Sequence, residues 1–427
     1  MTPTDTTRAI EAVWRIESAR LIAGIARIVG DIGLAEELAQ DALVAALEQW
    51  PVDGIPAKPG AWLMSTAKHR GIDQLRRRSV LQRKHDEIGR DLDVQQRIAL
   101  ADLADTTDDV GDDLLRLIFT ACHPVLTTDA RVALTLRLLG GLTTDEIAQA
   151  YLVPESTIAQ RIVRAKRTLS EAHVPFEVPH GADLSPRLAS VLDVVYLIFN
   201  EGYAATTGPE WTRPGLCDAA LRLGRMLEVV APSEPEVHGL AALMEIQASR
   251  LAARVGPAGE PIRLLDQDRG RWDKVLIRRG LLALDRAERH GGASGPYTLQ
   301  AAIAACHARA RRPEDTDWPR IVALYDAFVQ LTPSPVVDLN RAVAIGMAFG
   351  PEAALDALEP LASEPSMRDY HLLPAVRGDL LLRSGRSAEA AAAFRRAAEL
   401  TRNERERHLL LDRARAAAGS ADGPGRA

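Results

Sequence analysis

Residues 143–169 read TTDEIAQAYLVPESTIAQRIVRAKRTL, and their spacing predicts two short helices joined by a tight turn. Thr143 and Glu146 stand three residues apart, the spacing of a capping box, so the first helix begins there. The dipeptide 153–154, Val-Pro, ends it, and Ser156 or Thr157 opens the second helix. The second helix has an apolar stripe made of Ile158, Ile162, Ala165 and Leu169. The pattern indicates a helix-turn-helix.

The second of these helices is polar and basic away from its apolar stripe. Between Ile158 and Ser170 there are four bases and no acid. Such a surface suits contact with base edges and phosphates in the major groove of DNA. An α-hairpin with a solvated basic face is the alternative. The capping box, the proline turn and the acid-free helix together favour DNA binding.

Length and composition of the whole chain limit the possible fold and cellular compartment. It has 427 residues, enough for two or three domains, and is 47% hydrophobic but only 4% aromatic, so we expect an all-α fold. The sequence shows no membrane span and no signal pattern, which predicts a cytoplasmic protein. The cysteines at 122, 217 and 306 are far apart, so we expect no disulfide framework, no metal site and no cofactor.

Charge is distributed unevenly around a net value of −6. Residues 61–90 hold eight Lys or Arg against three acids, whereas residues 91–113 hold eight Asp against one Arg. A polyanion responds to local charge rather than to the total, so the basic segment is a candidate nucleic-acid surface. The acidic segment is expected to be a tether between domains.

With these patterns in place, residues 143–169 resemble region 4 of extracytoplasmic-function (ECF) sigma factors. The match runs without a gap through 146–148, 154, 157, 161, 164–167 and 169, although Ser156 replaces the usual Gly and Ala159 a frequent Lys. The resemblance implies contact with the promoter −35 element. The residues that it assigns to this contact are Ser156, Thr157, Gln160, Arg161, Arg164, Lys166 and Arg167.

The front of the chain resembles region 2 of the same family. Residues 35–43, AEELAQDAL, match its polymerase-binding helix and imply polymerase contacts at Glu36, Glu37, Gln40 and Asp41. Residues 61–78 match the helix that melts the −10 element, with His69 in place of the usual Asn and Thr66 in place of Ile. The implied −10 contacts are Lys68, His69, Arg70, Arg76, Arg77 and Arg78. Trp62 falls among the apolar positions, and core packing is expected for it.

The C-terminal half resembles the tetratricopeptide-like extension of one subgroup of the family, through YLIFNEGY at 196–203. The motif residues are Tyr196, Phe199, Asn200, Glu201 and Tyr203. A second polar cluster, DQDRGRW, follows at 266–272. Paired carboxylates from the two clusters would suit an enzyme, but no catalytic motif accompanies them, and a role in holding helix ends is favoured. Three helix pairs are expected to end near Leu331, Leu361 and Leu400.

We therefore expect four segments: region 2 at 1–90, an acidic linker at 91–113, region 4 at 114–175 and a helical extension at 183–416, with a disordered tail after it. The resemblance implies a non-enzymatic sigma factor whose partners are RNA polymerase core and promoter DNA. The extension is expected to pack against residues 1–175, to bind a regulatory protein and to be required for activity. A helix-turn-helix regulator with a tetratricopeptide-like sensor is the alternative, and a helical-repeat enzyme with a DNA-binding appendage is less favoured.

Overall fold

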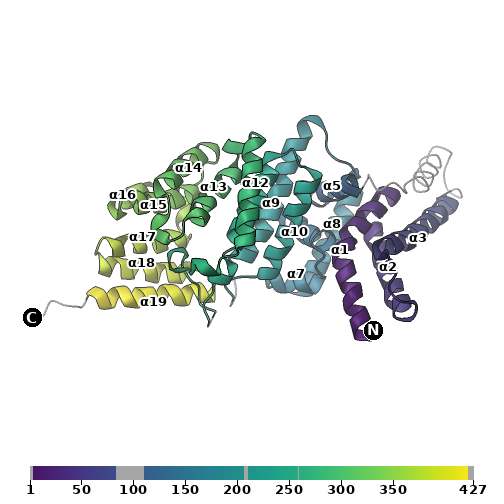
Figure 1. Ribbon diagram of the computed structural model, residues 1–427, viewed down its shortest axis with the longest axis horizontal. Coiled ribbons are helices and arrows are strands. Elements are labelled where there is room, and N and C mark those ends of the chain that lie inside the picture. Colours follow the sequence, from purple (N-terminus) through teal and green to yellow (C-terminus); the bar gives the residue numbers. More distant parts are fainter. Residues whose placement is uncertain (1–2, 83–109, 206–209, 258, 422–427) are drawn as a thin grey trace, which may run out of the picture. The chain divides into compact units, whose positions relative to one another are not determined.

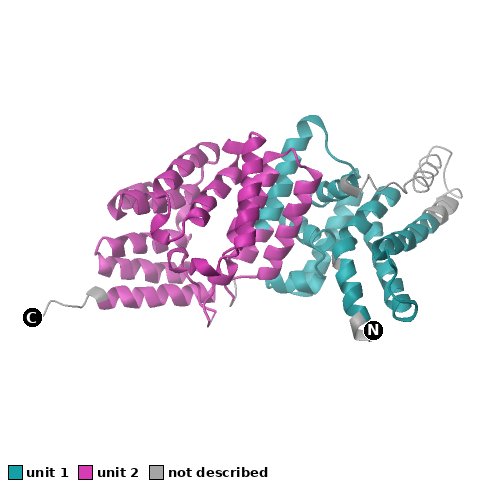
Figure 2. Cartoon of the chain, in the orientation of Figure 1, with its two compact units in different colours: residues 1–197 teal, residues 198–427 magenta. Residues whose placement is uncertain are grey.

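The computed structural model describes residues 3–82, 110–205, 210–257 and 259–421, and these ranges contain helices but no strand (Figure 1). The all-α fold class is confirmed. The chain forms two compact units, residues 1–197 and 198–427 (Figure 2). No helix in the described ranges is long and apolar enough to cross a bilayer. The predicted acidic linker lies mostly outside the described residues, which resume at residue 110.

The first unit begins with a three-helix group, which we call the N-terminal lobe. Its helices are α1 (Pro3–Val29), α2 (Ile32–Asp53) and α3 (Pro59–Gln82). Small and branched apolar residues such as Ile25 and Ala39 are fully buried where these helices meet. The helix α2 starts at Asp31, whose Oδ1 accepts the Leu34 N–H at 2.9 Å.

The breaker-rich segment after α2 begins later than the sequence suggests. Residues 51–60 are rich in proline and glycine, which predicts a loop from Pro51, but α2 continues through Pro51 to Asp53. The helix ends at Gly54, whose φ of 84° lies in the left-handed region and whose N–H donates to the Trp50 carbonyl. Trp62 of α3 then packs edge-on against Trp50, with ring centroids 5.3 Å apart. The core role expected for Trp62 is confirmed.

A second group of helices in this unit forms what we call the helix-turn-helix lobe. It consists of α5 (Val110–Ala121), α6 (Thr128–Leu138), α7 (Thr144–Tyr151) and α8 (Glu155–Glu171). The capping box is confirmed, because the Glu146 N–H donates to Thr143 Oγ1 at 3.1 Å and the Thr143 N–H to Glu146 Oε2 at 2.7 Å. The apolar stripe of α8 is buried as predicted.

Two helix starts differ from expectation. The helix α8 begins at Glu155 with Pro154 as its N-cap, and neither Ser156 nor Thr157 caps it. Proline fixes its own φ at a value that suits the helix entry, and its carbonyl accepts the Thr157 N–H at 2.9 Å. The helix α5 begins at Val110, four residues before the predicted start, and places Asp112 and Asp113 in its first turn. Carboxylates there are stabilised by the positive end of the helix dipole.

The helix α9 (Leu184–Tyr203) carries the unit boundary within it. Its first half packs on the helix-turn-helix lobe: Arg187 Nη2 donates to the Phe119 carbonyl at 2.9 Å, and Ser190 Oγ donates to the Cys122 carbonyl at 3.2 Å. Residues 184–197, which we expected in the extension, therefore belong to the first compact unit.

The second unit is a stack of antiparallel helices. After α9 come α10 (Pro214–Val230), α11 (Pro235–Ala248), α12 (Lys274–Arg289), α13 (Pro296–Arg309), α14 (Trp318–Leu331), α15 (Pro335–Phe349), α16 (Pro351–Ala362), α17 (Leu372–Arg383), α18 (Ser387–Leu400) and α19 (Glu404–Ala421). From α13 onward each helix packs against the next one in sequence. The three predicted helix pairs are present, since α14, α16 and α18 end at or beside the predicted leucines.

The pair α17–α18 shows why small residues occur in these helices. Gly378 lies under the ring of Phe394, and a Cβ on it would come within 2.7 Å of Phe394 Cε1. The turn between the two helices is made by Gly385, with φ of 76°. The tail expected after residue 416 is wrong as far as residue 421, because α19 runs to Ala421 and Ala417 is buried.

Candidate nucleic-acid interface

The candidate DNA-reading surface is the outward face of α8. Ser156, Gln160, Arg164 and Arg167 are all exposed and follow one another at spacings of four, four and three residues, which is one helix face. The opposite stripe is buried, so the helix is held with this face outward. A helix about 17 residues long with a polar outer face fits the major groove.

The remaining predicted −35 residues lie at the flanks of that face. Thr157 is half-buried, and Arg161 is half-buried with Nη2 3.2 Å from Asp129 Oδ2 of α6. Arg167 forms an ion pair with Glu171 at 2.6 Å, one turn along the same helix. That pair raises the pKa of Arg167, mainly through the hydrogen bond that Arg167 donates to Glu171, so the guanidinium remains charged.

Lys166 points to a different partner. Its ammonium group forms an ion pair with Glu36 of α2, in the N-terminal lobe. Arg137 of α6 also reaches Glu36, with Nε 2.8 Å from Oε1, and Gln40 donates to the same oxygen at 2.8 Å. Only 4% of Glu36 is exposed. We call this set of four residues the lobe joint.

The lobe joint combines residues from two predicted sites. Glu36 and Gln40 were assigned to polymerase, and Lys166 to DNA. The buried carboxylate is compensated by two cations and a hydrogen bond, which is the condition under which a buried charge is tolerated. Glu37 and Asp41, the other two predicted polymerase residues, are exposed, and Asp41 lies 3.5 Å from Arg70 of α3.

The predicted −10 residues lie along α3. Lys68 is half-buried, while His69 and Arg70 are exposed. His69 Nδ1 donates to the Ser65 carbonyl at 2.6 Å, which leaves Nε2 facing outward. The backbone of α3 continues through Arg76, Arg77 and Arg78, but their side chains are outside the described residues.

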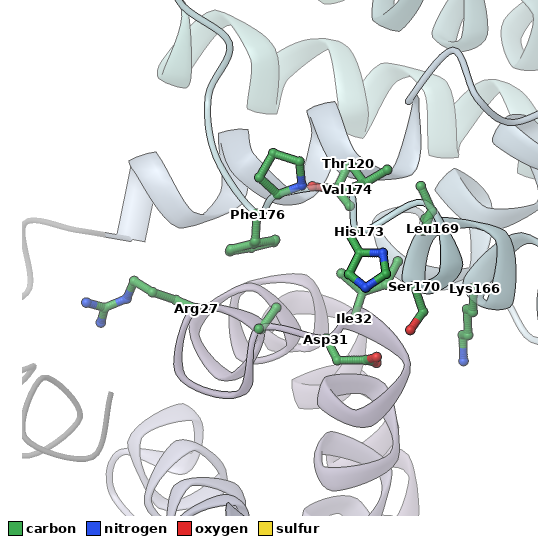
Figure 3. Close-up of a pocket in the computed structure, with 13 residues that line it drawn as sticks. Arg27, Asp31, Ile32, Thr120, Lys166, Leu169, Ser170, His173, Val174 and Phe176 are labelled. Carbon is green, nitrogen blue, oxygen red and sulfur yellow. The ribbon is translucent and has the colours of Figure 1, made fainter. Parts of the chain in front are cut away.

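Next to the lobe joint is a pocket of about 530 Å³ between the α1–α2 turn and the end of α8 (Figure 3). Ile32, Leu169 and Phe176 give it an apolar wall, and Arg27, Asp31, Lys166 and His173 give it a polar rim. Arg27 also forms a second ion pair between the lobes, since its Nε lies 2.9 Å from Asp113 Oδ2. The pocket is lined by both lobes, so its shape depends on their contact.

The lobe joint was missed by sequence reasoning. Glu36 and Arg137 are 101 residues apart, and no local pattern marks Arg137 as a partner. Arg27 and Asp113 are also far apart in sequence and carry no motif. The one available signal was the spacing of Glu36, which lies four residues after Ile32 and three before Ala39, on the apolar face of the helix, whereas Glu37 and Asp41 share another face.

The cysteines and the extension motif take structural positions. Burial raises the pKa of the Cys122 thiol to about 11 and that of Cys217 to about 12, which keeps both neutral and unreactive. In the motif, Phe199 is buried, Glu201 pairs with Arg213, and the Tyr203 carbonyl accepts from Arg254 at 3.1 Å. Tyr196 and Asn200 are half-buried on α9.

The carboxylates that an enzyme would need are engaged elsewhere. Glu201 pairs with Arg213, Asp266 is exposed and pairs with Arg263 at 2.7 Å, and Asp268 is exposed and accepts the Gly270 N–H at 2.8 Å. No group of three or more metal-ligating side chains is gathered in the described parts of the chain.

Comparison with known families matches three parts of the chain. Residues 16–80 match the family described as Sigma-70 region 2, and residues 116–169 match Sigma-70, region 4. Residues 187–288 match a family of unknown function, DUF6596. No solved structure matches the chain.

Similar proteins point the same way. The chain is 45% identical to an uncharacterized protein of Rhizobium meliloti over 89% of each chain. It is 31% identical to the ECF RNA polymerase sigma factor SigK of Mycobacterium ulcerans, over 34% of this chain and 75% of that one. It is 29% identical to the probable ECF RNA polymerase sigma factor SigI of Mycobacterium tuberculosis, over 40% of this chain and 57% of that one.

Proposed function

Since this chain belongs to the extracytoplasmic-function sigma factors, we propose that α8 reads the promoter −35 element while α2 and α3 engage RNA polymerase core and the −10 element. The chain is a sigma factor with a C-terminal helical extension, and promoter-specific initiation is its function. We assign it a non-enzymatic role in the cytoplasm, where core polymerase works.

One observation carries the assignment of α8. Its four outward residues, at 156, 160, 164 and 167, form a continuous polar and basic face, and the buried stripe behind it fixes the orientation of the helix. Arg164 and Arg167 supply phosphate contacts in this proposal, and Ser156 and Gln160 lie where base edges would be read.

The test is transcription in vitro with purified core polymerase on a genomic promoter pool, followed by binding to the promoter so identified. Losing a phosphate contact through Arg164→Ala should weaken binding to all sequences alike and reduce the salt slope by about one. Losing a base contact through Gln160→Ala should relax specificity at one position, by about 1–3 kcal/mol. A matched control is Arg396→Ala, an exposed arginine of α18 that pairs within its own helix, as Arg167 does.

Each variant has an outcome that would contradict its assigned role. If Arg164→Ala and Arg396→Ala give the same promoter output and the same salt slope, α8 is not the DNA-reading helix. If Gln160→Ala leaves the promoter preference unchanged at every position, its outward placement has no role in sequence readout.

The lobe joint suggests how the free chain is held. Glu36, on the predicted polymerase surface, is buried against Arg137 and Lys166. We propose that this is the resting arrangement, and that binding to core separates the lobes so that Lys166 reaches DNA. In an open arrangement Glu36 would exchange its two cations for basic or polar groups of the polymerase clamp.

The extension is proposed to be required for activity and to bind a regulatory protein. The test compares full-length protein with a chain ending at Leu197, the end of the first compact unit. Unchanged promoter output and unchanged response in cells would show that the extension is dispensable.

A further inference from the structure

The two polar motifs of the extension, 199–203 and 266–272, come together around three arginines. Arg254 stacks on Tyr203, with Cζ 3.7 Å from the ring centroid. Arg250 lies between the motifs, with Cζ 5.7 Å from the Tyr203 centroid and 5.6 Å from that of Trp272. Arg269 lies on the other side, 4.9 Å from Trp272. We call these three residues the arginine cluster.

The arginine cluster has only neutral hydrogen-bond partners. Arg250 donates to the Tyr203 hydroxyl at 2.6 Å and to Gln247 Oε1, and Arg254 donates to the Tyr203 carbonyl. Arg269 donates to two carbonyls at the C-terminal end of α13, at 307 and 310, and to the hydroxyl of residue 316. Among the described residues, no carboxylate lies within ion-pair distance of any of the three. Glu201, which belongs to the same motif, is taken by Arg213.

Charge in the cluster is therefore out of balance. Arg250 and Arg269 are each 8% exposed, and the three guanidiniums together carry three positive charges. The C-termini of α9 and α13, whose carbonyls they reach, supply about half a negative charge each. About two positive charges remain uncompensated. Burial and the repulsion of Arg250 lower the pKa of Arg254 and of Arg269, although exposed acids at 314 and 315 act in the opposite direction on Arg269.

The cluster also contains buried donors without a partner. These are Nε of Arg254, Nε of Arg269 and the indole N–H of Trp272, a residue that is only 3% exposed. Nδ1 of His307 beside them is likewise unpaired. Buried donors that make no hydrogen bond are rare in folded proteins and cost about 1–3 kcal/mol each. These donors all belong to the arginine cluster or to the Trp272 ring on which it packs, and beside uncompensated charge they indicate a missing acceptor.

We propose that the arginine cluster binds a small phosphate dianion, either free phosphate or the phosphate group of a small monoester. A phosphate offers oxygens in several directions, and the unpaired donors come from two guanidinium planes and an indole. A carboxylate, with two oxygens in one plane, would satisfy one guanidinium fork and leave the rest. The dianion would also match the residual charge of about two. This site is separate from the DNA-reading and polymerase-binding surfaces of the first unit.

The first experiment uses the full-length wild-type chain. Its melting temperature is measured at pH 7.5 with inorganic phosphate or with glycerol phosphate at about 10 mM, against sodium chloride of equal ionic strength. A specific site should raise the melting temperature by about 2–4 °C or more. The larger rise of the two identifies free phosphate or a monoester as the ligand class. If neither probe raises it above the chloride value, the proposal is wrong.

Three variants test whether the phosphate-dependent rise in melting temperature comes from the arginine cluster. Gln247→Glu is nearly isosteric and places a carboxylate on Arg250, so it should raise the melting temperature without phosphate and weaken phosphate binding at least tenfold. Trp272→Phe removes the unpaired indole N–H but keeps an aromatic ring, and should weaken binding several-fold. Arg271→Gln, at an exposed position of the same segment, is the matched control and should change neither quantity.

A phosphate response that survives in both Gln247→Glu and Trp272→Phe would place binding elsewhere and overturn the site. An equal loss of phosphate binding in Arg271→Gln would show a general effect of charge, and it would also overturn the proposed site. These measurements need neither polymerase nor DNA, so they fail or succeed independently of the sigma-factor assignment.

Discussion

Neighbouring glutamates on α2 have opposite environments. Glu36 is buried in the lobe joint, while Glu37 is exposed one residue later. The sequence assigned both to polymerase, and this single-residue difference decides which of them can be tested by charge reversal. Only the exposed positions allow a change in binding to be separated from a change in folding.

We expect Glu37→Lys together with Asp41→Lys to weaken binding to core polymerase, because both carboxylates are exposed on the face assigned to the clamp. The free energy of unfolding should change by no more than about 0.5 kcal/mol. Pull-down of core and urea unfolding measure the two effects. The control is Glu359→Lys, an exposed position of α16. Core binding equal to that of the control would contradict the assignment of this surface.

His307 predicts a dependence of stability on pH. Burial, together with the charges of Arg250 and Arg269, lowers its pKa to about 3 from an ordinary value of 6.5. The unfolded chain thus binds one more proton than the folded chain between these values. The stabilising contribution is complete above pH 6.5 and is lost as the pH falls toward 3, at up to about 1.4 kcal/mol per pH unit.

The free energy of unfolding, measured with urea at about pH 7.5, 6 and 5, checks this expectation. The variant His307→Gln should lose less stability on acidification than the wild type, whereas His173→Gln, at an exposed position, should follow the wild-type curve. Parallel curves for His307→Gln and the wild type would show that the acid sensitivity has another source.

At the scale of single elements, one close helix contact of the extension, between α17 and α18, is testable. A Cβ on Gly378 would lie 2.7 Å from Phe394 Cε1, so Gly378→Ala must push α17 and α18 apart. We expect a loss of about 1–3 kcal/mol in the free energy of unfolding. Gly215 of α10 has open space around its Cα, and Gly215→Ala should be neutral or slightly stabilising. If both variants behave alike in urea unfolding, the packing argument for Gly378 fails.

Elements governed by short-range rules could be predicted from the sequence. The capping box at Thr143 and the buried stripe of α8 depend on residues three and four apart, and both were found where expected. The start of α8 was missed because Pro154 replaces the expected side-chain cap. Contacts across long separations could not be predicted. Glu36 and Lys166 are each unremarkable in their own helices, and only the folded chain brings them together.

The same limit applies to the extension. Each polar motif was visible in the sequence. The Tyr203 carbonyl at the end of α9 accepts from Arg254, outside both motifs, whereas Arg269 of the second motif donates to the last carbonyls of α13. The convergence of the motifs was not visible, because Arg250 and Arg254 belong to neither motif. The −10 and −35 assignments, the polymerase residues, the segment boundaries and the packing of the extension against residues 1–175 stay predictions.

For the molecule as a whole, the lobe joint predicts that the free chain is restrained. Glu36→Gln keeps the side-chain shape but weakens the pairs to Arg137 and Lys166, which should favour separated lobes. A shift of about 1–2 kcal/mol would raise the affinity of the free chain for −35 DNA by about five- to thirty-fold. Fluorescence anisotropy with labelled promoter DNA measures it.

The matched control for this experiment is Glu37→Gln, which removes the same charge from the neighbouring exposed position. It should raise DNA affinity only by the small amount expected from net charge. Equal effects of the two variants would mean that charge, and not release of the joint, controls DNA binding.

A truncation near residue 178 would combine loss of the extension with damage to the helix-turn-helix lobe. It would remove the first half of α9, whose Arg187 and Ser190 bond the helix-turn-helix lobe. Loss of transcription would then report damage to the DNA-reading lobe as well as loss of the extension. Ending the chain at Leu197 keeps these contacts and tests the extension alone.

The two ends of the second unit are joined, because the buried Asn403, just before α19, donates to the carbonyls of Ala205 at 3.1 Å and Glu210 at 2.8 Å, after α9. An open stack of repeats can fray from its last helix while the first stays folded. Here the same two hydrogen bonds of Asn403 hold both ends, so neither end can separate without breaking them. We expect the second unit to unfold cooperatively from both ends, because loss of the Asn403 hydrogen bonds would loosen its first helices and its last helices together.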